Sequence, residues 1–443
     1  MSDNKKIDYL SRLPPELIQT IFDQFESRDR ALVNPLSKRF VPFQQLRLYR
    51  TVSLSSYDQL DKLCYTAKTT QGLMDKLVSF EVNILPQSDD RSNLNPETEE
   101  EDPLVPTSEE VKTLLSTLDN VSSVEVRGSS RLAALLLSSE VSIKYLPKLV
   151  DLGIASTLSD FDDPFHPAFY SSLVSYTELE EFSLFVWRNH QSIRLSTKPL
   201  PDIYPSRMSI FSVSLYGPLS SSATSVNALL TSFGYLGMLD LADYSPTSRM
   251  YDLLDALDCP EGLVFLCLKR FSTEGPPPQG SIVDRLTKFT SLDRLVLAGS
   301  SAPVSSEFYS ALRALPLEDI AFGLEADVDL EKLAKVISGP QKHASLRRIS
   351  FENVIAKKGT TFEEMNYEIY TGPSGDEFGP YPDWELPRWS ERFKPDTLKK
   401  FLKTAKKEGI KVDGSALEAL EIEEEFTGEL DFLYSYGEDP WED

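Results

Sequence analysis

Few residues of this chain have the types and spacing that catalysis or metal binding requires. The three histidines, His166, His190 and His343, lie far apart in the sequence and match no ligand or triad spacing. We therefore interpret each as a structural or surface residue. Cys259 and Cys267 are eight residues apart, and Cys267 alternates with leucines, which favours a small buried strand residue over a reactive thiol.

Motifs that bind phosphate or activate a nucleophile are also absent from the sequence. There is no P-loop, no G-x-G-x-x-G, no G-x-S-x-G and no H-E-x-x-H. The glutamates Glu421 and Glu423–Glu425 could attract cations, but a solvated charge run is the simpler interpretation. We expect a protein that is not an enzyme and that uses no cofactor and no metal ion.

The charge of the chain is concentrated in two segments. The 443 residues carry a net charge of -24, of which residues 85–110 contribute -8 and residues 360–443 contribute -13. The rest of the chain is close to neutral. These acidic segments would be repelled by a phosphate backbone, so we expect no nucleic acid among the partners.

The cysteines and the apolar runs indicate the cellular compartment. Three cysteines form neither a disulfide framework nor a zinc spacing, and they fit buried thiols in a reducing compartment. The first residues contain no apolar signal-peptide core, and no apolar run approaches 18 residues. We therefore expect no membrane contact and a location in the cytoplasm or nucleus.

Most of the chain repeats a short apolar pattern, L-x-x-L-x-L or a near variant. Eleven copies lie between Tyr49 and Phe351, and they begin 28, 44, 28, 30, 31, 26, 27, 29, 25 and 29 residues apart. A period near 28 residues indicates one supersecondary unit per repeat, stacked as a solenoid. Helix signals lie between the copies, for example after Ser108, Thr247 and Ser306. Strands that alternate with helices predict an α/β fold with a parallel sheet.

The repeats also divide the chain into parts. The solenoid is expected over residues 49–358, and its 44-residue interval contains an acidic inserted loop at 85–110. Residues 359–443 are expected to form a C-terminal cap followed by an acidic tail, because the last apolar face of a solenoid must be covered. Within this cap the pattern predicts an amphipathic helix at Pro395–Glu408 that ends at Gly409.

The first 48 residues break from the repeat and read as a small helical module. Leu13-Pro14-Pro15-Glu16-Leu17 begins a helix, and apolar residues follow at Ile21, Phe22 and Phe25. A second apolar group closes on Ser37-Lys38-Arg39-Phe40. The simplest structural interpretation of this module is an N-terminal cap on the solenoid.

This module resembles the F-box. That family has the pattern L-P-x-E-[LI]-x-x-x-I-[FL], followed by an apolar stretch that closes on K-R-[WF]. The adjoining repeats make the chain similar to fungal-type F-box proteins with leucine-rich repeats. The resemblance implies that the box docks on a Skp-type adaptor, and through it on a cullin. The apolar residues implied to contact the adaptor, or to pack beneath that surface, are Leu13, Pro14, Leu17, Ile21, Phe22, Leu32 and Val33.

The resemblance implies the substrate-recognition subunit of a ubiquitin ligase, which binds an unknown client protein on its repeat surface. Two alternatives remain open. One is a leucine-rich-repeat scaffold unrelated to ubiquitin, whose head is only a cap. The other is an enzyme whose site is assembled from scattered residues, for which the sequence offers no specific support.

Outward positions of the strands are candidates for client binding. Aromatic and methionine side chains there often form recognition surfaces. Lys269, Arg294 and Arg348 occupy later outward positions in an otherwise acidic chain. They would either bind an acidic or phosphorylated segment of the client or pair with acids of the same chain. The candidate client-binding residues are Phe185, Tyr216, Met238, Phe265, Lys269, Arg294 and Arg348.

Overall fold

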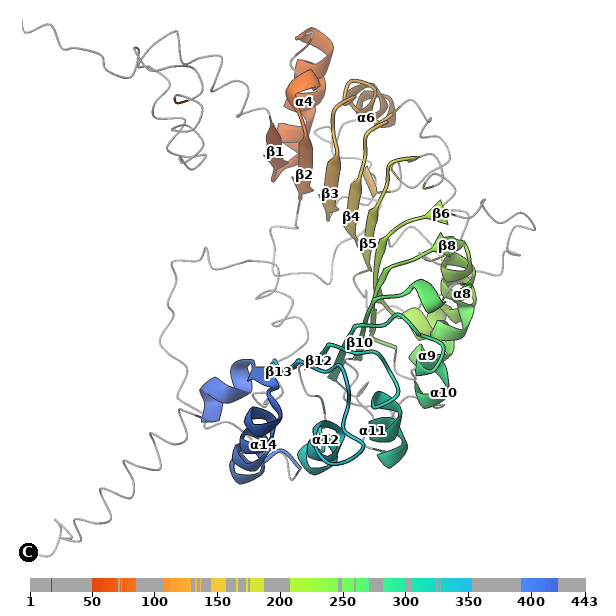
Figure 1. Cartoon of the computed structure of the whole chain (residues 1–443). Helices are drawn as coiled ribbons and strands as arrows, with labels where there is room; N and C mark the ends of the chain where they lie inside the picture. Colours follow the sequence, from red (N-terminus) through yellow and green to blue (C-terminus); the bar gives the residue numbers. More distant parts are fainter. Residues whose placement is uncertain are drawn as a thin grey trace, which may run out of the picture. The chain divides into compact units, whose positions relative to one another are not determined.

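A parallel β-sheet with one strand per repeat forms the frame of each of two units, Met1–Pro201 and Asp202–Asp443 (Figure 1). The coordinates are a computed structural model. The structure describes residues 17, 50–70, 72, 74–84, 107–128, 132–133, 136, 145–156, 165, 173, 176–186, 208–245, 249–258, 260–270, 282–299, 305–323, 326, 328–352 and 392–420.

Unit 1 contains five parallel strands that pair in chain order. They are β1 (Thr51–Leu54), β2 (Ser79–Asn83), β3 (Ser123–Arg127), β4 (Asp151–Ser156) and β5 (Glu181–Val186). The register places equivalent apolar residues side by side: Phe80 lies opposite Val124, and Val82 lies opposite Val126. All four side chains are fully buried, so the repeats share one continuous core.

Two described helices of unit 1 lie side by side, α4 (Tyr57–Thr69) and α6 (Ser108–Leu115). A capping box begins α6: the Thr107 hydroxyl accepts from the Glu110 backbone N–H, and the Glu110 carboxylate accepts from the Thr107 N–H at 3.0 Å. The inserted loop therefore ends earlier than the expected residue 110. Residues 85–106, the rest of that loop, lie outside the described residues.

Unit 2 contains seven parallel strands that again pair in chain order. They are β7 (Ser212–Gly217), β9 (Met238–Asp243), β10 (Phe265–Arg270), β11 (Arg294–Gly299), β12 (Asp319–Phe322), β13 (Arg348–Phe351) and β14 (Lys411–Asp413). A separate two-stranded sheet joins β6 (Met208–Ser209) and β8 (Phe233–Tyr235).

Helices lie along one side of the strands of unit 2 (Figure 1). They are α8 (Ala223–Thr231), α9 (Met250–Leu253), α10 (Ile282–Leu286), α11 (Ser306–Leu312), α12 (Leu330–Ile337) and α14 (Pro395–Glu408). Polar side chains begin some of them: the Ser305 hydroxyl accepts from the Phe308 N–H at 3.2 Å, and Asp329 accepts from the Lys332 N–H at 3.0 Å.

All eleven strands expected from the repeat pattern are present, and the α/β fold with parallel strands is confirmed. A twelfth strand of the main sheet, β14, was not expected, and neither were β6 and β8. Strand β14 pairs with β13 and places Gly414 opposite Phe351, where the other repeats have an apolar side chain. Gly414 has a φ of +109°, and a Cβ there would collide with the Phe351 carbonyl oxygen. Because glycine has no side chain, this strand lacks an apolar residue of the repeat pattern, and a search for that pattern does not find it.

The described residues 392–420 form helix α14 and strand β14 at the C-terminal end of the sheet of unit 2. Helix α14 spans the predicted Pro395–Glu408 and ends at Gly409, which has a φ of +75°. Phe351 of the last full repeat meets Phe393 at 5.1 Å and Phe401 at 5.8 Å between ring centroids. These rings cover the apolar side chain of the last repeat of unit 2.

Two glycines with positive φ offer a matched test of the strand register. Gly299 has a φ of +63°, and a Cβ there would overlap the carbonyl oxygen of Arg270 on the neighbouring strand. Gly339 has a φ of +89° but nothing near its Cβ position. We expect Gly339→Ala to cost about 1–2 kcal/mol, the backbone strain alone. Gly299→Ala should cost more, at least about 3 kcal/mol, because the strands must also separate.

Urea unfolding of both variants measures this difference. The midpoint for Gly299→Ala should lie clearly below that for Gly339→Ala. Equal losses would contradict the close packing of β10 against β11.

Candidate functional site

The side chains at outward strand positions of unit 2 form its sheet face, opposite the helices. On this face the register brings Met238, Phe265 and Arg294 into one row across three strands. Met238 and Phe265 are half-buried, and the Arg294 guanidinium lies 5.4 Å from the centre of the Phe265 ring. A cation at this distance is attracted by the ring, so the row combines apolar surface with one positive charge.

Next to this row, Tyr216, Asp240 and Lys269 form a hydrogen-bonded cluster. The Tyr216 hydroxyl donates to the Asp240 carboxylate at 2.5 Å, and the Lys269 ammonium donates to the same carboxylate oxygen at 2.9 Å. Burial opposes the charge of Lys269, but Cys267, Asp240 and Tyr216 outweigh it and raise the Lys269 pKa. Burial, assisted by Asp240, raises the Tyr216 pKa. The lysine therefore stays charged and the tyrosine stays neutral at physiological pH.

The row that contains Arg294 continues with charged side chains across β12, β13 and β14. Asp319 lies between Arg294, at 3.5 Å, and Arg348, at 3.7 Å. Arg348 also binds Asp413 at 3.0 Å, and Lys411 binds the same carboxylate at 2.9 Å. The hydrogen bond to Asp413 raises the pKa of Arg348. Opposite charges thus alternate along four neighbouring strands.

All three cations named from the sequence, Lys269, Arg294 and Arg348, have carboxylate partners within the chain. Of the two roles considered for them, the structure shows the intrachain pairing. An acidic or phosphorylated client would have to displace Asp240, Asp319 or Asp413. This part of the sheet face is therefore nearly balanced in charge.

The expected exposure of Phe185 is wrong. Its side chain on β5 is only 5% exposed, although it follows the outward alternation of that strand. Its register neighbour is Ala155, itself buried, so the small residue leaves room for the ring to lie against the sheet. Phe185 therefore offers little surface to a client.

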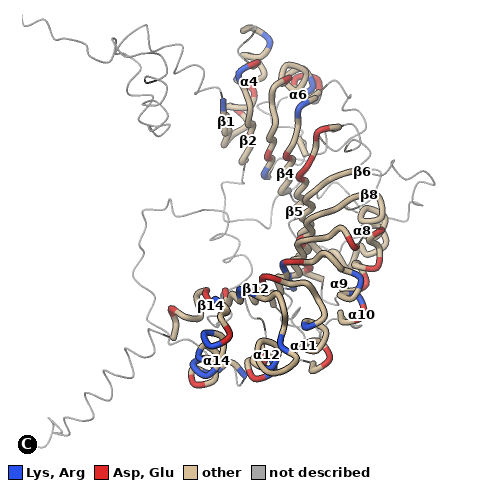
Figure 2. The backbone as a smooth tube through the Cα atoms, viewed as in Figure 1, with Lys and Arg blue, Asp and Glu red and all other residues tan. Residues whose placement is uncertain are grey.

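The sheet face of unit 1 has a different charge from that of unit 2. Its outward positions carry four carboxylates, Glu81, Glu125, Asp151 and Glu181. One cation joins them, Arg127, which binds Glu125 at 2.6 Å. Burial raises the pKa of Asp151, although a hydrogen bond from Ser123 opposes the rise. Figure 2 marks the charged residues along the backbone of both units.

Of the proposed adaptor-binding residues, the structure describes only Leu17. It is helical, and its side chain is 51% exposed. The others, Leu13, Pro14, Ile21, Phe22, Leu32 and Val33, lie outside the described residues. An exposed leucine on a helix is compatible with a binding surface as well as with the edge of a cap.

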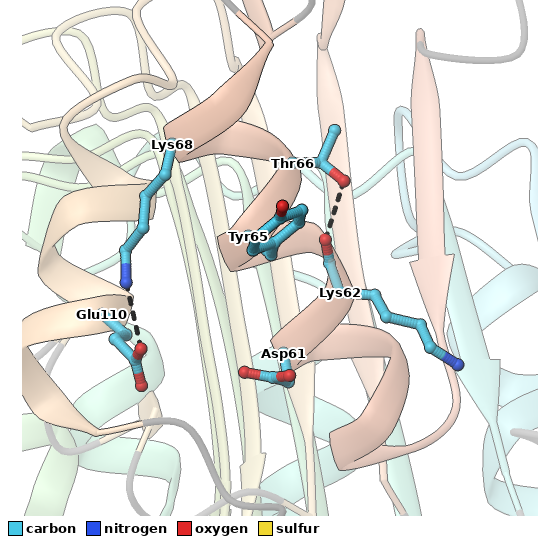
Figure 3. Close-up of a pocket in the computed structure, with 6 residues that line it drawn as sticks. All are labelled: Asp61, Lys62, Tyr65, Thr66, Lys68 and Glu110. Carbon is cyan, nitrogen blue, oxygen red and sulfur yellow. Dashed lines mark hydrogen bonds and ion pairs between the residues drawn. The ribbon is translucent and has the colours of Figure 1, made fainter.

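A hollow of about 320 Å³ lies between α4 and α6 of unit 1 (Figure 3). It is lined by Asp61, Lys62, Tyr65, Thr66, Lys68 and Glu110. Lys68 and Glu110 bridge the two helices at 3.0 Å, and the Tyr65 side chain is 67% exposed. Neither a histidine nor a cysteine lines the hollow. Its polar groups are those of a solvated surface, and they suggest no catalytic arrangement.

The described cysteines and histidine are structural. Burial, together with Glu110, raises the pKa of Cys64 to about 11, so its thiol stays protonated. Burial likewise raises the pKa of Cys267. His343 is 5% exposed, and its Nδ1 accepts from the backbone N–H groups of Ser345 and Leu346. It therefore holds the turn before β13. His166, His190 and Cys259 lie outside the described residues.

One charged pair lies inside unit 2, at the ends of β9 and β10. Asp243 is fully buried and accepts from the backbone N–H groups of Ser220, at 3.2 Å, and Ser245, at 3.0 Å. Arg270 lies opposite it in register and is 1% exposed. Burial lowers the Arg270 pKa, and Asp243 opposes the change. The Arg270 guanidinium nitrogens have no hydrogen-bond partner among the described residues, so Asp243 offsets the buried charge only through its electrostatic field.

The acids that pair with the three bases were missed from the sequence. Asp240 and Asp319 occupy outward positions of the repeats next to Lys269, Arg294 and Arg348, so alignment of the repeats by position could have found them. Asp413 could not have been found in this way, because its strand lacks the apolar pattern.

Comparison with known proteins identifies no family for this chain. A scan against protein-family models gives no match, and a search of curated proteins gives none either. Among the described residues there is no group of three or more His, Cys, Asp or Glu placed to hold a metal ion. None of the helices in the same residues is both long and apolar enough to span a bilayer.

The Lys68–Glu110 bridge predicts a measurable titration. Lys68, followed by the Thr107 cap, lowers the pKa of Glu110 from 4.5 to about 2. Because the folded-state pKa is depressed, the stabilisation from this group is present above pH 4.5 and is lost as the pH falls toward 2. NMR titration of the Glu110 carboxyl should give this low value. Lys68→Met should raise it toward 4.5.

The control for this titration is Lys112→Met, which removes the lysine that binds the neighbouring Glu109 at 3.2 Å. It should leave the Glu110 pKa nearly unchanged. If both variants shift this pKa equally, the bridge between α4 and α6 is not its cause.

Proposed function

We propose that this protein is the substrate-recognition subunit of a Skp–cullin–F-box ubiquitin ligase. In this role the N-terminal module binds a Skp-type adaptor, and the repeats bind a client protein. The subunit performs no chemistry itself. It raises the effective concentration of a client lysine near the ubiquitin-charged enzyme, wherever in the cytoplasm or nucleus the ligase acts.

The observation that carries the proposal is the order of two sequence patterns. The F-box-like pattern closes at Phe40, and the first strand of the repeats begins at Thr51. The parallel sheet with one strand per repeat supports the second half of this arrangement, because a leucine-rich-repeat solenoid would contain such a sheet. The exposed leucine at position 17 supports the first half, because a docking helix needs apolar side chains at its surface.

For the client we propose the row Met238, Phe265 and Arg294. Tyr216 and Lys269 are held by Asp240, and Arg348 is held by Asp413, so these side chains are already engaged. Met238 and Phe265 remain half-buried neighbours with apolar surface to offer. Arg294 lies above the Phe265 ring and pairs with Asp319 at 3.5 Å, but its side chain is half exposed, so it can orient a polar group at the edge of the contact while keeping that partner.

Leu17→Asp tests adaptor binding without disturbing a core. The side chain is half exposed, so the fold should tolerate the change, while a buried contact to the adaptor would be lost. We expect the affinity for a purified Skp-type adaptor to fall at least about 30-fold, equivalent to about 2 kcal/mol. Isothermal titration calorimetry measures the affinity, and circular dichroism checks the fold.

The matched control is Tyr65→Asp, which changes another exposed apolar side chain on a helix. It should bind the adaptor like the unchanged protein. If the protein with Leu17 intact binds no adaptor, or if Leu17→Asp binds equally well, the ligase function is rejected. The leucine-rich scaffold whose head is a cap would then be the better explanation.

The client surface is tested by Met238→Ala with Phe265→Ala. Removing two apolar anchors from the centre of a contact should reduce the recovered client at least about tenfold. The adaptor should be retained, because it binds the other end of the chain. Quantitative mass spectrometry of proteins co-purified with the tagged chain measures both.

Here the control is Tyr235→Ala, since Tyr235 is 48% exposed and belongs to the small β6–β8 sheet. It should leave client and adaptor unchanged. An unaltered client list in the double variant, with the adaptor still bound, would show that clients bind elsewhere.

A further inference from the structure

Helix α14 carries a row of lysines on the side that faces away from the core. Its buried residues are Leu398, Phe401 and Ala405. Five lysines occupy the opposite side, at helical spacings of three and four residues. This lysine face consists of Lys399, Lys400, Lys403, Lys406 and Lys407. In Figure 2 it is visible as a run of positive residues along α14.

Three members of the lysine face have no acidic partner within the described part of the chain. Lys400, Lys403 and Lys406 are exposed, and none of them makes an ion pair with a described carboxylate. The nearest acids of the helix are Asp396, in its first turn, and Glu408, which binds Lys342 at 2.8 Å. This differs from the sheet face of unit 2, where carboxylates pair with Lys269, Arg294 and Arg348.

The spacing of the lysines makes their repulsion direct. Lys400 and Lys403 are three residues apart, and Lys403 and Lys407 are four apart, so each pair lies on adjacent turns. Like charges at this spacing destabilise a helix. Lys406 and Lys407 are partly compensated, because they lie in the last turn, where the helix dipole favours cations. An anionic segment that lies along the face would reduce the remaining repulsion between these lysines.

The chain supplies such a segment immediately after the cap. Residues 421–443, the acidic tail, contain ten acids and no base. Leu420, the last described residue, is 7% exposed, so the tail starts from a fixed point of unit 2. Its 23 residues can extend to roughly 75 Å, whereas α14 is about 21 Å long. The tail can therefore reach every lysine of the face.

We propose that the acidic tail binds the lysine face of α14 in the same molecule. A tethered segment acts at an effective concentration in the millimolar range, which a free acidic partner rarely attains. The acidic segment at 85–110 is much farther from α14 along the chain, so it lacks this short tether. The contact neutralises the cap and keeps other anionic molecules from its lysines.

Zero-length cross-linking with a carbodiimide tests the contact in the full chain. Cross-links should join Lys399–Lys407 to carboxylates of residues 421–431, and mass spectrometry should locate them. When light and isotopically heavy protein are mixed before cross-linking, the two peptides of each cross-link should be both light or both heavy, because the contact is within one molecule. Their yield should fall several-fold in 1 M salt, where the screening length is about 3 Å.

A matched pair of variants tests the charge dependence. Glu423→Gln, Glu424→Gln and Glu425→Gln together should raise the acetylation rate of Lys400 and Lys403 at least about twofold, because the tail no longer holds them. The control neutralises three consecutive glutamates in the other acidic segment: Glu99→Gln, Glu100→Gln and Glu101→Gln. This second variant should leave the lysine rates unchanged.

Three outcomes would overturn the proposal. Cross-links from the lysine face to residues 85–110 would assign the face to the inserted loop, and mixed light–heavy peptides would assign it to a second copy. If the acetylation rates of Lys400 and Lys403 do not change in the tail variant, the tail does not cover the face, and an anionic molecule other than this chain would be the better candidate. None of these results depends on whether the protein binds an adaptor.

Discussion

Each repeat of this protein can bury its apolar strand residues only against the repeats beside it. This constraint fixes the register: Leu239, Leu266 and Leu295 lie side by side because any shift would expose them to water. The register in turn decides which outward residues become neighbours. The last repeat has no following neighbour, so α14 and β14 supply one, and Phe393 and Phe401 cover Phe351.

The same register produces the charge pattern of unit 2. Cations and carboxylates at equivalent positions of successive repeats become adjacent, as Arg294, Asp319 and Arg348 do. Their pairing leaves little net charge for recognition on that part of the sheet face. If a client binds there, apolar contact at Met238 and Phe265 must supply most of the affinity, while the neighbouring charges supply orientation.

Among the described residues, two other surfaces are less evenly balanced in charge. Unit 1 presents carboxylates on its sheet face, and the cap of unit 2 presents lysines on α14. Long-range attraction or repulsion of other molecules therefore depends on these surfaces, and it should weaken with salt. The proposed contact between the acidic tail and α14 would remove the positive surface and leave an acidic exterior.

The sequence by itself determined the repeat, the positions of eleven strands and the limits of α14, because period, cap residues and a terminal glycine are local signals. It did not reveal β14, since Gly414 replaces the apolar residue that marks the other strands. Burial of Phe185 and the partners of Lys269, Arg294 and Arg348 depend on side chains from neighbouring repeats. Only the tertiary structure brings those together, because a register contact joins residues about 28 positions apart in the chain.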